Sequence, residues 1–73
     1  MEPATLNAMC KAFASGTVGV LVIELETART RFVVDGSVVT GPLGGAVHDA
    51  LDTQLSFERT IGGRRYFFKP FVA

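Results

Sequence analysis

The apolar stretch "TVGVLVIELE" (residues 17–26) restricts the fold of this chain more than any other segment. Its β-branched and aliphatic side chains fill both alternating positions as far as Ile23, and Glu24 and Glu26 then mark one side as solvent-facing. A strand that is apolar on both sides is typical of the interior of a sheet. The stretch therefore predicts a central strand.

Two segments have the spacing of amphipathic helices, which we predict over residues 4–14 and 44–54. The apolar stripe of the first consists of Leu6, Met9, Cys10 and Phe13. The apolar stripe of the second consists of Ala46, Val47, Ala50, Leu51 and Leu55, and its far side carries His48, Asp49, Asp52 and Gln54. Both stripes predict helices that pack against a sheet.

Further extended segments complete the predicted fold. A strand around Arg31 to Val34 leads through an Asp35-Gly36 turn into a short strand through Val38 and Val39. The ending "SFERTIGGRRYFFKPFVA" predicts a hairpin whose two-residue loop is Gly62-Gly63.

The predicted order is helix, strand, strand, strand, helix, strand, strand, in a single domain over residues 1–73. This is an α+β fold in which two helices pack on one small mixed or antiparallel sheet. Pro70 cannot donate to a sheet ladder, so the last strand is expected to lie at an edge or to change register there.

The composition argues against several classes of protein. Seven basic and seven acidic residues cancel, so neither nucleic acid nor a membrane is expected as a partner. The only cysteine, Cys10, cannot form an internal disulfide and is expected as a small buried hydrophobe. The apolar runs are too short to span a bilayer and the opening "MEPATLNAMCKAF" does not resemble a signal peptide, so we expect a cytoplasmic protein.

The chain carries many apolar side chains for its size. Its 73 residues are 48% hydrophobic and include six phenylalanines. A small core leaves part of such surface uncovered, which predicts a protein partner or self-association into a homo-oligomer.

Catalysis is not expected from this set of residues. His48 is the only histidine, and the sequence offers no local cluster of nucleophile, base or metal ligands around it. We therefore predict a protein that is not an enzyme and holds no metal, with His48 as an exposed helical residue.

The segment "GPLGGAVHDAL" (residues 41–51) raises the question of a ligand site. Its glycines come just before the second helix, where free N–H groups favour an anion. We interpret it first as a strand-to-helix turn and second as a binding edge. The candidate ligand-binding residues in the second interpretation are Gly41, Gly44, Gly45, His48, Asp49, Arg64 and Arg65, the arginines being candidate phosphate partners.

The segment "GGRRYFFKPF" interleaves basic and aromatic residues. In a strand, Tyr66 and Phe68 fall on one face and Phe67 and Phe71 on the other. Strand packing is favoured over stacking with single-stranded nucleic acid, because the chain has no net positive charge. The candidate interaction surface consists of Tyr66, Phe67 and Phe71.

The carboxylates at the end of the central strand need a solvent or cationic environment. Glu24 and Glu26 point to the same side, and their mutual repulsion predicts exposure or pairing with Arg29, Arg31 or a hairpin arginine.

Taken in order, "ATLNAMCKAFASGTVGVLVIELE", "RFVVDGSVVTGPLGGAVHDAL" and "TIGGRRYFFKPF" resemble the N-terminal domain of the xanthine dehydrogenase accessory protein family, the XdhC/CoxI group. The shared features are a helix ending in a glycine before an apolar strand, an Asp-Gly turn, a glycine-rich turn into a helix and a glycine turn before a strand that ends near a proline. The resemblance implies an accessory role in loading or protecting the molybdenum cofactor of molybdenum hydroxylases.

The resemblance carries over to few individual positions. They are Gly36, Gly41, Gly44, Gly45 and, loosely, Asp49. The family's Gly-Ser-x-Pro loop is replaced by "ETARTR", and "GGAVHD" lacks the cysteine that usually follows the glycines. The resemblance therefore implies a module that binds rather than catalyses.

Two functions stay open at this point. The first is an accessory module that binds the molybdenum cofactor or its enzyme through the glycine segment. The second is a protein-interaction or inhibitor module without a small-molecule ligand, which docks through exposed aromatic residues.

Overall fold

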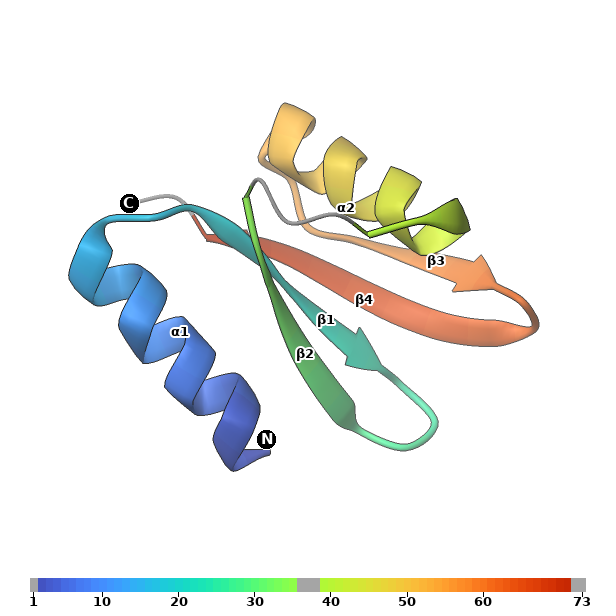
Figure 1. Cartoon of the computed structure of the whole chain (residues 1–73). Helices are drawn as coiled ribbons and strands as arrows, with labels where there is room; N and C mark the ends of the chain where they lie inside the picture. The colour runs from blue at the N-terminus through green and yellow to red at the C-terminus, as the bar shows by residue number, and fades with distance from the viewer. Residues whose placement is uncertain (1, 36–38, 72–73) are drawn as a thin grey trace.

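The computed structural model describes residues 2–35 and 39–71 and confirms an α+β fold. Helix α1 (Pro3–Ser15) precedes strands β1 (Gly19–Glu24) and β2 (Arg29–Val34); helix α2 (Gly41–Thr53) precedes strands β3 (Phe57–Ile61) and β4 (Arg64–Phe71). The four strands form one antiparallel sheet in the order β2-β1-β4-β3 (Figure 1).

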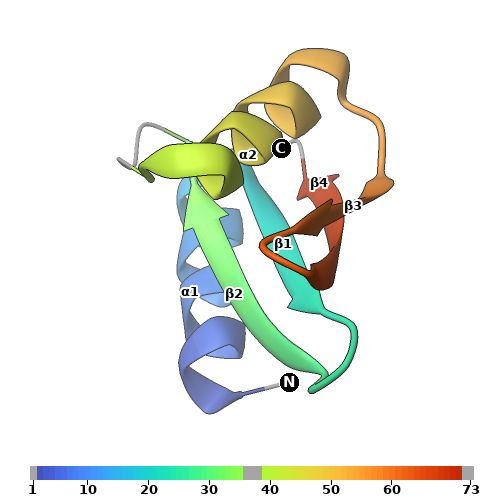
Figure 2. The ribbon, with the colours of Figure 1, turned by 90° about the vertical axis from the view of Figure 1, so that its right-hand side faces the viewer.

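The two helices cover opposite faces of this sheet, as Figures 1 and 2 show. Strand β1 lies between β2 and β4, which confirms the predicted central strand. Its Val20 and Val22 belong to the core under α2, and its Leu21 belongs to the core under α1. The apolar character of both sides of β1 thus corresponds to a helix on each side of the sheet.

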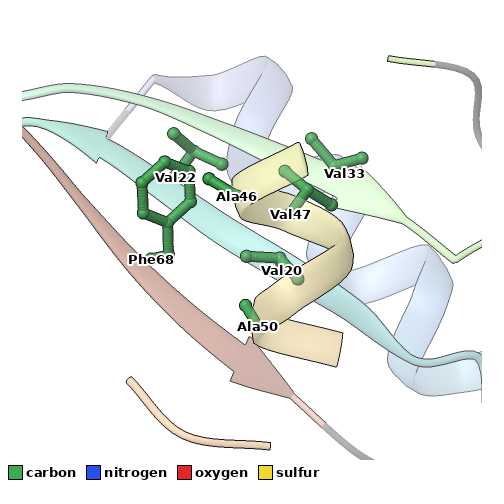
Figure 3. Packing of buried hydrophobic residues seen from close by; sticks show 7 residues of the cluster. All are labelled: Val20, Val22, Val33, Ala46, Val47, Ala50 and Phe68. Atoms are coloured by element: carbon green, nitrogen blue, oxygen red, sulfur yellow. The ribbon is translucent and has the colours of Figure 1, made fainter. Parts of the chain in front are cut away.

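Small side chains bring α2 close to the sheet. Ala46 and Ala50 are fully buried, as are Val20 and Phe68 beneath them (Figure 3). Alanine side chains are small, so the helix backbone lies near the strands. The ring of Phe68 then fills the space that remains between the two layers.

The buried side of α1 is rotated from the predicted apolar stripe and shares only Met9 with it. Thr5 and Ala12 are buried, whereas Leu6 and Phe13 are 55% and 51% exposed. Cys10 is exposed as well, so its prediction as a buried hydrophobe is wrong.

Hydrogen bonds to β2 hold this side of α1 on the sheet. The Thr5 hydroxyl donates to the Thr30 carbonyl at 2.8 Å. The Glu2 carboxylate accepts from the Thr30 N–H at 2.9 Å and from the Thr30 hydroxyl at 2.8 Å. A buried hydroxyl such as that of Thr5 requires a partner, so these bonds favour the observed rotation of the helix over burial of Leu6.

The predicted strand through Val38 and Val39 is wrong, and the element order is α-β-β-α-β-β. Val39 lies outside any strand, and its half-buried side chain packs against the core under α2 instead of pairing in the sheet. Gly36 and Val38 lie outside the described residues, so only Asp35 of the predicted Asp35-Gly36 turn is described.

The terminal hairpin is confirmed, but β4 is an inner strand and not an edge strand. Its register with β1 runs on through Val20 opposite Pro70, so no change of register occurs there. Pairing with β3 ends at Phe57 opposite Phe68. Pro70 therefore lies where β4 has one neighbouring strand only, and a missing N–H donor is tolerated at such a position.

No helix within residues 2–35 and 39–71 is long and apolar enough to cross a bilayer.

Candidate functional site

The glycine segment forms the start of α2 and not a loop ahead of it. The helix, predicted from Gly44, begins at Gly41, which has φ +75° and is followed by Pro42. Glycine accepts this left-handed backbone at little cost, and proline suits the first helical turn. Gly44 and Gly45 consequently lie within the helix.

Gly44 has a packing role. A Cβ at this position would lie 1.9 Å from the carbonyl oxygen of Val39, whereas a Cβ at Gly45 would meet nothing within 4 Å. The absence of a side chain at Gly44 lets the preceding segment pass close to the helix, which is the architectural interpretation of this glycine.

The structure separates the candidate ligand-binding residues. Gly44 and His48 line a cavity of about 240 Å³ beside Asp35. Asp49 forms an exposed ion pair with Arg59, with 3.1 Å between Oδ2 and Nη2. These groups do not surround one common site.

Arg64 and Arg65 are both engaged by carboxylates at the end of β1. Arg64 pairs with Glu24 at 2.9 Å, and Arg65 pairs with Glu26 at 3.3 Å. The pKa of Glu26 is lowered chiefly by a hydrogen bond from the backbone of Glu26 itself, and to a smaller extent by hydrogen bonds from Arg65. The predicted pairing of these glutamates with hairpin arginines is confirmed, and it places the two arginines with Glu24 and Glu26 instead of beside the glycines.

The candidate interaction residues lie on two faces of the sheet. Tyr66 packs against the core under α2, and Phe71 packs against the core under α1. Phe67 pairs with Ile23 of β1 and so points to the same side as Phe71, but it belongs to neither buried core. Phe67 is half-buried and lies on the α1 side of the sheet, outside the core under α1.

The area around Phe67 continues onto the flank of α1. The Phe13 ring lies 5.6 Å from the Phe71 ring and 6.4 Å from the Phe32 ring, between centroids. We call the combined area the α1-side surface. It consists of Leu6, Cys10, Phe13, Ile23, Phe67 and Phe71.

Gly19 makes room for this aromatic group. A Cβ on Gly19 would lie 2.5 Å from the ring of Phe32. The Phe32 ring thus occupies the space above the glycine and stays within reach of both Phe13 and Phe71. Sequence reasoning missed this role, because the two residues meet only across paired strands.

A second cavity, also missed from the sequence, opens near the start of α2. It has a volume of about 150 Å³, and its lining includes Leu43, Arg29, Arg31 and Tyr66. The alternation of Arg29 and Arg31 along a strand could have indicated that both point to one face.

His48 is exposed, as predicted. Among residues 2–35 and 39–71, no group of three or more His, Cys, Asp or Glu side chains is arranged to hold a metal ion. The described residues offer exposed apolar surface and arginine side chains with which a partner or ligand could interact.

Comparisons with models of known protein families, with curated proteins and with solved structures find no match to this chain.

Proposed function

We propose that this chain is a non-catalytic protein-interaction module whose partner is a second copy of itself, bound through the α1-side surface. The observation that carries the proposal is the exposure of Leu6 and Phe13, each more than half exposed, beside a sheet face that α1 covers only in part. An apolar area of this kind is typical of a surface that binds another protein.

The sheet face is wider than the helix that lies on it. Neighbouring strands lie about 4.8 Å apart, so four strands span about 15 Å, whereas a helix with its side chains is about 10 Å wide, and one helix therefore leaves a strip of the face uncovered. Helix α1 contacts chiefly β2 and reaches β4 at Phe71 through the Phe13 ring, so β3 and most of β4 are left without a helix on that side (Figure 2).

The helix that suits this space is α1 of another copy. Asn7, Cys10 and Ala14 are exposed and uncharged, and Lys11 is the only charged residue between Pro3 and Ser15. A two-fold axis would place each α1 between its own sheet and the uncovered β4 of the partner, which buries both copies of Phe67. The net charge of zero leaves no overall repulsion between the copies.

The test is the mass of the protein in solution, measured by sedimentation or light scattering. We expect twice the chain mass of 7.8 kDa for the unchanged protein. Phe67→Glu should weaken association by about a hundredfold or more, because it buries an unpaired charge in the interface.

Leu55→Glu is the matched control. Leu55 is 66% exposed but follows α2 and lies outside the α1-side surface, so the same chemical change there should leave the dimer intact. A wild-type monomer at every soluble concentration, or equal dissociation of both variants, would overturn the proposal. Far-ultraviolet circular dichroism checks that both variants are folded.

The resemblance to the XdhC/CoxI group supports a different binding function, directed to the molybdenum cofactor or its enzyme. It stays a prediction, and the glycine segment adds little to it, because Gly44 has a packing role and Arg64 and Arg65 have carboxylate partners. Copurification of a molybdopterin-type cofactor from the native host would support this function.

A further inference from the structure

The cavity of about 150 Å³ near the start of α2 lies on the face opposite to the α1-side surface. Leu43 of α2 closes one side, Arg29 and Arg31 of β2 another, and Tyr66 of β4 a third. Leu43 and Tyr66 are half-buried and pack against the core under α2, so this cavity has an apolar wall beside two basic side chains.

The two arginines come from alternating positions of one strand. In the register with β1, Arg29 lies opposite Glu24 and Arg31 lies opposite Val22. Val22 belongs to the core under α2, so the register directs both arginine side chains to that face of the sheet.

The positive charge of this pair is not neutralised within the described part of the chain. Arg59, Arg64 and Arg65 each form an ion pair, whereas no described carboxylate pairs with Arg29 or Arg31. Glu24, the carboxylate nearest in register, bonds instead to Arg64 at 2.9 Å. The lining of the cavity thus includes two arginines without a carboxylate partner among the described residues, and one carboxylate, that of Glu24, that is already engaged.

We propose that this cavity binds a small phosphate monoester with an apolar or aromatic substituent. Guanidinium groups match phosphate oxygens with two parallel hydrogen bonds, and two arginines neutralise a phosphate dianion. The substituent lies against Leu43 and Tyr66. A water molecule takes about 30 Å³ in the liquid, so the cavity holds a group of about five such volumes, which suits a phosphate with part of its substituent.

Phenyl phosphate at low ionic strength is the probe, and binding is followed by amide chemical shifts in NMR spectra. We expect saturable binding with the largest shifts at residues 29–31, 43 and 66, and weaker binding of inorganic phosphate, which has no ring. Arg29→Gln and Arg31→Gln should each lower the affinity for phenyl phosphate by about tenfold, since each removes a charge-assisted pair of hydrogen bonds.

Arg65→Gln is the matched control, because it removes the same charge from the opposite face of β4. It should leave the affinity for phenyl phosphate unchanged. An equal loss of affinity in Arg65→Gln would mean that only the overall charge of the protein attracts phenyl phosphate. Unchanged affinity in Arg29→Gln and Arg31→Gln would place the ligand elsewhere. Either result would overturn the proposal.

The result is independent of self-association. Phe67→Glu alters the other face of the sheet, so a monomeric Phe67→Glu protein should bind phenyl phosphate as the unchanged protein does. Loss of binding in that folded variant would contradict the assignment of the ligand to this cavity.

Discussion

Glu2 shows how a single side chain joins the start of α1 to an edge strand. Its carboxylate accepts hydrogen bonds from the Thr30 N–H and the Thr30 hydroxyl, and these two bonds are the main causes that lower the pKa of Glu2. An edge strand has N–H groups without a strand partner, and here a carboxylate satisfies one of them.

The lowered pKa of Glu2 predicts a contribution to acid sensitivity. A carboxyl group whose pKa is lower in the folded chain stabilises the fold above its unfolded pKa, and this stabilisation is lost as the pH falls through the folded pKa. Thermal unfolding from neutral pH to about pH 3 should therefore show a smaller fall in melting temperature for Glu2→Gln than for the unchanged protein.

Glu58→Gln serves as the comparison, because Glu58 is an exposed carboxylate on β3 outside this network. An acid dependence that is the same in Glu2→Gln as in the unchanged protein would contradict the role given to Glu2. Glu2→Gln should also lower the free energy of unfolding at neutral pH, since the Thr30 N–H and hydroxyl lose a charged acceptor.

At the scale of elements, α2 illustrates two different uses of neighbouring glycines. Gly44 lies against the carbonyl of Val39, and Gly45 faces open space. Only Gly44 is needed for the approach of the preceding segment. Gly45 lies within the helix, where glycine is less favourable than alanine.

This contrast predicts opposite effects of the same substitution. Gly44→Ala should destabilise the protein by about 2 kcal/mol or more, because the new methyl group overlaps the Val39 backbone. Gly45→Ala should stabilise it by about 0.5–1 kcal/mol through helix propensity. Chemical denaturation measures both, and a destabilising Gly45→Ala would indicate a constraint on this glycine that the packing does not explain.

Helix α1 differs from α2 in how completely it is used. Its buried side faces β2. Leu6 and Phe13, on the flank of the helix, are each more than half exposed. At the level of the whole molecule, α2 lies across three strands, β1, β3 and β4, whereas α1 on the other face contacts chiefly β2 (Figure 1).

Self-association through that face predicts a stability that depends on concentration. A dimer stabilises the folded state by mass action, so the melting temperature should rise by a few degrees for each tenfold increase in protein concentration. Phe67→Glu should remove this dependence and Leu55→Glu should keep it. Differential scanning fluorimetry over a dilution series provides the measurement, and a constant melting temperature for the unchanged protein would count against the dimer.

Part of the candidate site followed from local pattern. Alternation predicts Phe67 and Phe71 on one face and Tyr66 on the other, and the repulsion between Glu24 and Glu26 predicts either exposure or pairing with arginines. The cavity between Arg29, Arg31 and Tyr66 could not be predicted, because it depends on which strands are neighbours and where α2 begins.

The sequence by itself determined the two helices, the central strand and the terminal hairpin, because periodicity and glycine turns act over a few residues. Tertiary structure alone decided which side of α1 is buried, that β4 lies inside the sheet, and that Val39 packs on α2 instead of forming a strand. These outcomes depend on contacts between segments far apart in the chain, such as Thr5 with Thr30. Local spacing carries no information about such contacts.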